Sequence, residues 1–233
     1  MEHVAQPGNR FQWKSADAYL FDIDGTLLLS PDRTHRYALH RALLDVYGIE
    51  TTIDGIAYHG KTDPGILRAA LERAGVPREA IDAKMPAALE VVRQDAAQKA
   101  DRFRPNVLPG IREVLDLLRG AGKLLGVASG NLESIGWLKL KAAGLAGYFE
   151  FGCFADESEL RVDVFRTAVG EVRRRLGSHA TVCFVGDTPD DVRAAQGAGG
   201  QIIAVGTGIF KFEDLAVHRP DATVNSCSEL LTL

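Results

Sequence analysis

Two aspartates, Asp22 and Asp24, lie one residue apart directly after the apolar run Ala18–Phe21. An apolar run that ends in acidic residues and Gly25 is typical of a buried strand whose last side chains enter a cleft. Because side chains alternate along an extended chain, both carboxylates should point the same way. Two like charges aimed at one point are costly unless they share a cation or a proton. The pattern therefore predicts a hard metal ion, with Mg²⁺ the natural candidate, although an acidic turn after a core strand is the simpler alternative.

Two later loops also end apolar runs with polar residues. Residues 129–131 (SGN) follow the apolar run 124–128 and precede a helical pattern, so that a hydroxyl and successive backbone N–H groups could hold a phosphoryl oxygen. An ordinary turn would use the same residue types. Residues 186–191 (GDTPDD) place a glycine and a carboxylate after another apolar run, and Pro189 opens a helix.

These segments resemble signatures of the haloacid dehalogenase superfamily. Residues 22–27 (DIDGTL) are similar to its first signature, SGN to its second and GDTPDD to its fourth, and the resemblance extends from residue 18 to about residue 230. Most members hydrolyse phosphate esters through an aspartyl-phosphate. The resemblance implies that Asp22 is the nucleophile and that Asp24 is the general acid and base.

The same resemblance implies a magnesium site and a phosphate site. Mg²⁺ would be held by Asp22, the backbone carbonyl of Asp24 and Asp187, with Asp191 supporting the site. Ser129, the Gly130 amide and Arg161 would hold the phosphoryl oxygens.

The third signature is where the chain departs from the family. Most phosphatases of the family carry a lysine there, whereas residues 156–165 contain no lysine and a single cation, Arg161. Arg161 resembles the arginine of a D-R-N-E-L type segment found in a subset of the family. A guanidinium can hold carboxylate and phosphate bidentately, so Arg161 could replace the lysine. The alternative is a surface arginine at a helix entrance.

Residues 30–104 show no strand-like alternation and predict three helices. The first should cover residues 36–47, the second should start with Asp63 as its N-cap, and the third should run from Pro77 toward Phe103 with a kink or break at Pro86. This insert resembles the helical cap of the phosphoglycolate-phosphatase-like branch. Lys61, in the segment HGKTD, would then face the substrate, although plain helix capping also explains that segment.

Helical and strand patterns alternate from residue 105 onward, which implies parallel βαβ units with functional residues at the carboxyl ends of the strands. The expected fold class is α/β. A doubly wound parallel sheet core similar to that of the superfamily would comprise residues 1–29 and 105–233, and residues 30–104 would form a small all-helical cap. We interpret residues 1–16 as a loose N-terminal arm.

Composition places the chain among ordinary globular proteins. It has 233 residues, 46% of them hydrophobic, and a net charge of −4, with no basic block that would favour nucleic acid or an anionic membrane. Its three cysteines lack metal-ligand spacing, which favours buried free thiols in a reducing compartment. These thiols lead us to expect a cytoplasmic protein. No signal peptide or transmembrane run is apparent.

The residues and the resemblance together predict a Mg²⁺-dependent phosphatase that acts on a small phosphorylated metabolite. A phosphomutase of the β-phosphoglucomutase type and a non-catalytic protein that binds a phosphorylated ligand are the alternatives. A dehalogenase is disfavoured, because a halide leaving group needs no acid such as Asp24. Monomer and homodimer both stay open.

Overall fold

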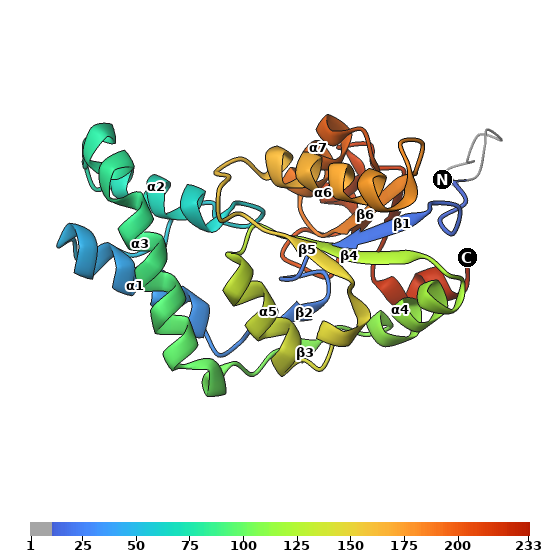
Figure 1. The fold of residues 1–233 in the computed structure, drawn as a ribbon, viewed down its shortest axis with the longest axis horizontal. Helices are drawn as coiled ribbons and strands as arrows, with labels where there is room; N and C mark the ends of the chain where they lie inside the picture. Colours follow the sequence, from blue (N-terminus) through green and yellow to red (C-terminus); the bar gives the residue numbers. More distant parts are fainter. Residues whose placement is uncertain (1–10) are drawn as a thin grey trace.

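The computed structural model describes residues 11–233, whose centre is a six-stranded sheet (Figure 1). The strand order is β5-β4-β1-β6-β7-β8, and every neighbouring pair is parallel. The order reverses between β1 and β6, which makes this the switch point of a doubly wound sheet. The strands are β1 (Ala18–Phe21), β4 (Leu124–Ala128), β5 (Phe151–Cys153), β6 (Val182–Gly186), β7 (Gln201–Val205) and β8 (Ala222–Val224).

Helices cover both faces of this sheet. One face packs against α4 (Ile111–Gly120), α5 (Glu133–Ala142) and the short helix η3 (Cys227–Leu231). The other packs against α6 (Arg161–Leu176), α7 (Pro189–Ala198) and α8 (Phe212–Ala216). Figure 1 shows α6 and α7 above the strands and α4 and α5 below them.

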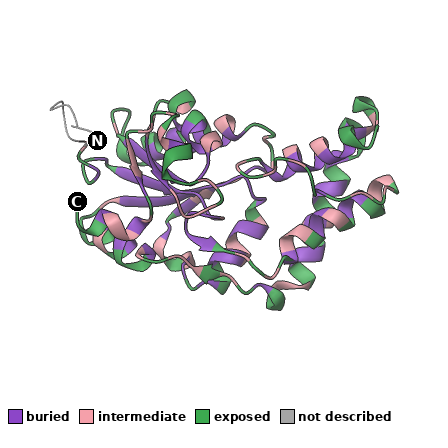
Figure 2. Ribbon diagram, turned by 180° about the vertical axis from the view of Figure 1, so that it is seen from behind, coloured by how far each residue is buried: buried purple, intermediate pink, exposed green. Residues whose placement is uncertain are grey.

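The side chains of strand β1 alternate between the two faces of the sheet. Tyr19 and Phe21 pack toward the face with α4, while Ala18 and Leu20 pack toward the face with α6. All four residues are buried, as expected for a central parallel strand that is covered on both sides. Figure 2 shows the same burial along most of the sheet, with the exposed residues on the outer surfaces of the helices and in loops.

Three helices form a separate layer to one side of the sheet (Figure 1): α1 (Thr34–Tyr47), α2 (Asp63–Arg73) and α3 (Arg78–Gln98). They bury an apolar cluster of their own, which Leu132 and Ile135 of the α5 region join. The two crossings between this layer and the sheet pair as a short antiparallel ribbon of β2 (Leu28–Leu29) and β3 (Asn106–Val107). Two short 3-10 helices, η1 (Ala100–Arg102) and η2 (Ala146–Tyr148), complete the elements. The predicted fold class, an α/β core with a small helical cap, is confirmed.

Two expectations about local structure were wrong in the cap. The N-cap of α2 is Thr62, whose hydroxyl accepts a hydrogen bond from Gly65, and Asp63 is the first helical residue. Helix α3 continues through Pro86 and ends at Gln98, so the expected alternative of a break at Pro86 was wrong, whereas a kink there stays a prediction. Pro86 lies on the exposed face of the helix, where the carbonyl that its ring leaves without a partner can meet water.

The expectation of a loose N-terminal arm was wrong for residues 11–16; residues 1–10 of that arm lie outside the described residues. Trp13 and Ala16 are buried, and the Trp13 ring packs edge-on against Tyr19. The apolar ring therefore fixes this segment against the sheet.

Two features expected from composition concern the cysteines and the membrane. Cys153, Cys183 and Cys227 are free and buried, as expected. Among residues 11–233, no helix is both long and apolar enough to span a bilayer.

Candidate active site

The polar residues predicted from the sequence gather at the carboxyl ends of β1 and β6. Asp22 directly follows β1 and Asp187 directly follows β6, and the two strands are neighbours. The Asp22 amide donates to the carbonyl of Val185 at 3.0 Å, which continues the ladder up to the aspartates. The strand order reverses at this pair, so the site occupies the crevice where doubly wound folds bind ligands.

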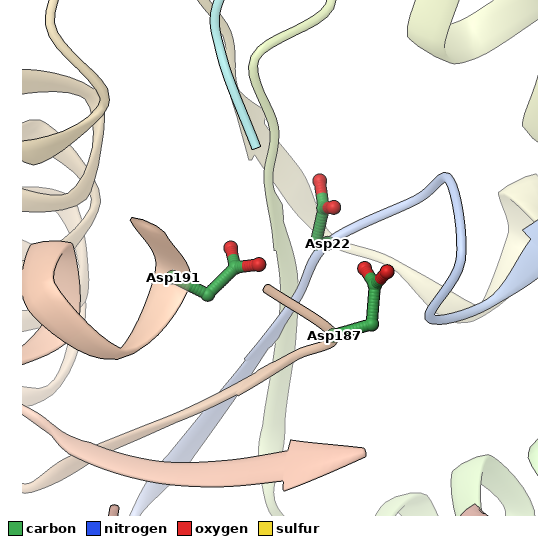
Figure 3. Close-up of side chains that lie close together, drawn as sticks. All are labelled: Asp22, Asp187 and Asp191. Carbon is green, nitrogen blue, oxygen red and sulfur yellow. The ribbon is translucent and has the colours of Figure 1, made fainter. Parts of the chain in front are cut away.

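Three carboxylates meet there (Figure 3). Asp22, Asp187 and Asp191 each offer an oxygen within 4.8 Å of the others, and all three residues are buried. Burial raises the pKa of Asp22 to about 6, and the negative charge of Asp191 adds to the rise while Arg161 opposes it. The pKa of Asp187 is also raised, mainly by burial and then by Asp191 and Asp22. This cluster carries more negative charge than its own cation balances.

The hydrogen bonds of Asp191 separate its role from those of the other two. One Asp191 oxygen accepts from the Thr188 amide (3.0 Å) and hydroxyl (2.6 Å), which completes a capping box at the start of α7. The other accepts from Arg161 Nε at 2.8 Å. Because both oxygens are engaged, Asp191 orients its neighbours, and Asp22 and Asp187 are the carboxylates free to bind a cation.

Two glycines, Gly208 and Gly25, leave the space that the Asp187 carboxylate occupies. A Cβ atom at Gly208 would lie 1.8 Å from Asp187 Oδ2, and one at Gly25, where φ is +84°, would lie 2.2 Å from the same oxygen. The Thr26 hydroxyl donates to Asp187 Oδ1 at 3.1 Å and fixes the side chain. Oxygen donors in a buried, anionic and tightly fixed set fit a hard divalent ion such as Mg²⁺.

Arg161, the first residue of α6, is buried between the carboxylates. Its Nη2 atom lies 2.9 Å from Asp22 Oδ1 and 2.6 Å from Asp191 Oδ1. Burial would lower the pKa of Arg161, but Asp191 and Asp22 raise it, so the guanidinium stays charged. Of the two alternatives left open by the sequence, the surface arginine is ruled out by this burial.

Asp24 has different surroundings. Its Oδ2 atom accepts from Lys139 Nζ at 2.5 Å and from Asn131 Nδ2 at 2.9 Å. Burial would raise the pKa of Asp24, but the charge of Lys139 and the hydrogen bonds from Lys139 and Asn131 outweigh it, and the pKa is lowered. Asp22 and Asp24 point into one cavity, yet they differ in their partners.

The cavity has a volume of about 520 Å³ and lies between the sheet edge and the cap. The loop with Ser129 and Gly130 forms one wall, and the cap segment around Lys61 forms another. These walls touch: the Asp63 amide donates to the Gly130 carbonyl at 2.7 Å, and a Cβ at Gly130 would lie 2.5 Å from the Lys61 carbonyl oxygen. The cap therefore lies closed over the phosphate-binding loop expected from the sequence.

The structure brings nearly all predicted site residues to this one cavity. Those that line it are Asp22, Asp24, Lys61, Ser129, Gly130, Arg161 and Asp187, whereas Asp191 lies behind them against Arg161. Lys61 is exposed and takes part in none of the ion pairs found among residues 11–233.

Sequence reasoning missed Lys139 and His35. Lys139 lies on the buried face of α5 with Ile135, Gly136 and Leu140, and this spacing was visible in the sequence as a lysine within an apolar helical stripe. His35, in the first turn of α1, showed no such pattern. Its role depends on the fold, which brings its ring to Lys139 and Asp63.

Comparison with known proteins agrees with this geometry. The family model described as haloacid dehalogenase-like hydrolase matches residues 16–199 of the chain. The chain belongs to this family of hydrolases. A probable phosphatase, IndB, from Dickeya dadantii is 30% identical over 216 residues, covering 91% of this chain and 90% of the relative. A phosphoglycolate phosphatase from Agrobacterium fabrum is 29% identical over 219 residues, covering 91% and 89%.

Solved structures show the same fold at lower identity. CbbY from Rhodobacter sphaeroides, in complex with phosphate, aligns with a TM-score of 0.70 at 21% identity over 93% of this chain and 96% of its own. A β-phosphoglucomutase from Clostridium difficile aligns with a TM-score of 0.66 at 17% identity, over 92% and 93%. With phosphatase-named relatives along nearly its whole length, this haloacid dehalogenase-like hydrolase is a phosphatase-type enzyme of the phosphoglycolate-phosphatase-like branch.

Proposed function

We propose that this hydrolase is a Mg²⁺-dependent phosphatase that cleaves a small phosphate monoester through an aspartyl-phosphate on Asp22. The observation that carries the proposal is the pairing of Asp22 with Arg161 at 2.9 Å, beside Asp187 and at the wall of a cavity that also contains Asp24. A nucleophile, a proton-transfer group, a fixed cation and an anionic metal cradle are the parts that phosphoryl transfer needs.

The chain's own residues would divide the work as follows. An oxygen of Asp22 attacks phosphorus, and the bond from phosphorus to the ester oxygen breaks. Asp24 gives its proton to the departing oxygen and then removes a proton from the water that attacks phosphorus, whereupon the bond from phosphorus to the Asp22 oxygen breaks and inorganic phosphate is released. Ser129, the Gly130 amide and Arg161 hold the remaining phosphoryl oxygens.

Mg²⁺ would be held by Asp22 and Asp187, with the backbone carbonyl of Asp24 as a third protein oxygen. When bound, the ion would neutralise charge between a carboxylate and a phosphate dianion. The approach of that dianion also places negative charge beside Asp24, which raises the pKa of its carboxyl group and favours the protonated form needed for the first step.

The substrate class follows from the size of the site and the chemistry of its cap. A cavity of about 520 Å³ under a closed helical layer suits a small metabolite. The exposed Lys61 would meet an anionic group of the substrate from the cap side. Relatives named phosphoglycolate phosphatases favour a small phosphorylated acid or sugar. Three free buried thiols and a metabolite substrate are consistent with a cytoplasmic enzyme.

The test is release of inorganic phosphate from an aryl phosphate at neutral pH, with Mg²⁺ or with a chelator. We expect Mg²⁺-dependent turnover that Asp22→Asn abolishes. Asp190→Asn is the matched control, because Asp190 lies in the first turn of α7, next to Asp191, but pairs with Arg193. Turnover that survives in Asp22→Asn would contradict the proposal, and transfer of the phosphoryl group between two sugar positions without net phosphate release would indicate a phosphomutase instead.

A further inference from the structure

Lys139 has an unusual position for a lysine. Its side chain is only 2% exposed, on the inner face of α5, and it ranks among the largest fully buried side chains of the described chain. A buried ammonium group is costly unless acceptors surround it. None of the expected steps at the phosphorus atom uses this lysine, so its burial requires another explanation.

The ammonium group has three donors, and three acceptors surround it. Asp24 Oδ2 lies at 2.5 Å, Asn131 Oδ1 at 3.0 Å and His35 Nδ1 at 3.1 Å from Nζ. Asn131 in turn donates from its Nδ2 to the same Asp24 oxygen at 2.9 Å. Lys139 and Asn131 therefore hold Asp24 Oδ2 from two directions, and a fully satisfied group of this kind has a single favoured arrangement.

The other oxygen of Asp24 is held much less firmly. Its Oδ1 atom has the Ser30 hydroxyl at 3.4 Å, which is a long contact. With one oxygen fixed by a cation and an amide, the carboxyl plane is set, and the second oxygen is left to exchange a proton with a ligand in the cavity.

Two residues of the cap, His35 and Asp63, extend this hydrogen-bond network beyond Lys139. His35 accepts from Lys139 at Nδ1, and its Nε2 lies 3.0 Å from Asp63 Oδ2. Asp63 Oδ2 also accepts from the Leu132 amide at 2.8 Å. A polar chain thus runs from Asp24 through Lys139 and His35 to Asp63, and it joins the sheet edge to the starts of α1 and α2. The acceptors of Lys139 are complete only when the cap lies in this position.

We propose that Lys139 is a positioning residue for Asp24, and that His35 of the cap completes its set of acceptors, so that cap closure and alignment of the general acid occur together. This inference rests on the proposed function, because it assumes that Asp24 exchanges protons with the ester oxygen and with water. It assigns to Lys139 an action through Asp24 alone, with no contact to the phosphoryl group.

The distinguishing readout is the dependence of kcat/KM on the leaving group. The departing oxygen of an alkyl phosphate needs a proton, whereas the leaving group of 4-nitrophenyl phosphate, 4-nitrophenolate, is a stable anion and needs almost none. We expect Lys139→Met to lower kcat/KM for an alkyl phosphate by about 10²-fold, and for 4-nitrophenyl phosphate by less than about threefold. Lys141→Met, two residues along the same helix and exposed, is the control and should match the wild type with both substrates. An equal loss with both substrates would mean a purely structural role and would overturn the inference.

A double variant guards against failure of the single variant to fold. Asp24→Asn combined with Lys139→Met removes both charges, so neither is left unpaired in the protein. If Lys139 acts through Asp24, the added substitution should change kcat/KM of Asp24→Asn by less than about twofold with either ester. A further large loss would overturn the inference.

The outcomes also separate this inference from the proposed function. If the loss of kcat/KM depends steeply on the leaving group in Asp24→Asn and not at all in Lys139→Met, the role of Lys139 is rejected. That result would leave the proposed phosphatase function unchallenged. A wild type that releases phosphate from neither ester would reject both.

Discussion

Asp22 and Asp24 are separated by a single residue, yet their surroundings are opposite. Asp22 lies among carboxylates, opposed by the single guanidinium of Arg161, and burial raises its pKa to about 6. Asp24 lies between Lys139 and Asn131; burial would raise its pKa, but the charge and hydrogen bonds of those partners lower it. The side with Asp22 holds three carboxylates and one cation, Arg161, whereas on the side with Asp24 one carboxylate is paired with one cation, Lys139.

This difference shows which of the carboxylates need an added cation. The carboxylates of Asp22 and Asp187 repel each other, and a divalent ion bound by both would remove this repulsion. The carboxylate of Asp24 is already paired with Lys139. Environments that separate the pKa values of two neighbouring carboxyl groups are a mark of divided catalytic roles. This division of roles should show in variants of both sides, most strongly when the carboxylates themselves are removed.

Removing each carboxylate in turn should give unequal losses. Asp22→Asn removes the group that would form the covalent bond, so phosphate release should fall by at least about 10³-fold with every ester. Asp24→Asn should cost about 10²-fold or less with an activated aryl ester, because that leaving group needs little acid assistance. Steady-state rates with the two variants measure the difference. Equal losses for all esters would break the division of roles.

Arg161 should be the hardest residue to replace on the Asp22 side. Arg161→Met leaves the buried Asp22 and Asp191 without their cation, so the free energy of unfolding should fall by about 3 kcal/mol or more and kcat by about 10²-fold. Arg161→Lys keeps the charge but cannot span both carboxylates as a guanidinium does. Its stability and its kcat should therefore lie between those of Arg161→Met and the wild type. Urea unfolding and phosphate release are the measurements. An Arg161→Met protein as stable as the wild type would contradict the pairing.

Mg²⁺ should stabilise the folded protein through the carboxylates of Asp22 and Asp187, not through that of Asp24. At a concentration about 100 times its Kd, a ligand that binds only the folded state adds about 2.7 kcal/mol. Thermal melting with Mg²⁺ and with chelator should show this gain in the wild type. Asp187→Asn should abolish it, while in chelator it should melt no lower than the wild type because a like charge has been removed. A full Mg²⁺ shift in Asp187→Asn would place the ion elsewhere.

Asp32 takes part in no ion pair among residues 11–233, so it is a reference for an aspartate that hydrogen bonds alone stabilise. Its oxygens accept from the amides of Thr34 and Arg104, each at 2.9 Å, where the chain crosses between sheet and cap. Burial would raise the pKa of Asp32, but these hydrogen bonds lower it below 3.8. Since the folded pKa is depressed, the stabilisation is complete above the unfolded value and is lost as the pH falls through the folded value.

Asp32→Ala should therefore cost about 1 kcal/mol at pH 7. The gap in unfolding free energy between Asp32→Ala and the wild type should shrink below about pH 4. Urea titrations across this range measure the gap. A gap that stays constant into acid would contradict the role of the carboxylate in these hydrogen bonds.

The sequence predicted the Asp22 side better than the Asp24 side, for physical reasons. Residues next to strand ends are constrained by the period of two and by the common edge of a parallel sheet, so Asp22 and Asp187 could be expected at one place. Lys139 reaches Asp24 from α5 and His35 reaches Lys139 from α1 in the cap, and only tertiary packing brings them together. The course of α3 through Pro86 and the packing of Trp13 likewise depend on which surface each side chain meets.

The central claim is that Asp22 carries the phosphoryl group between the two chemical steps. The direct test is an acid quench of Asp24→Asn during turnover of an aryl phosphate, followed by peptide mass analysis, because loss of the base should slow hydrolysis of the intermediate. The account predicts one added phosphoryl group on the peptide that contains Asp22, and none when Asp22→Asn is introduced as well. Continued turnover with no phosphorylated protein, or a phosphoryl group on another residue, would contradict it.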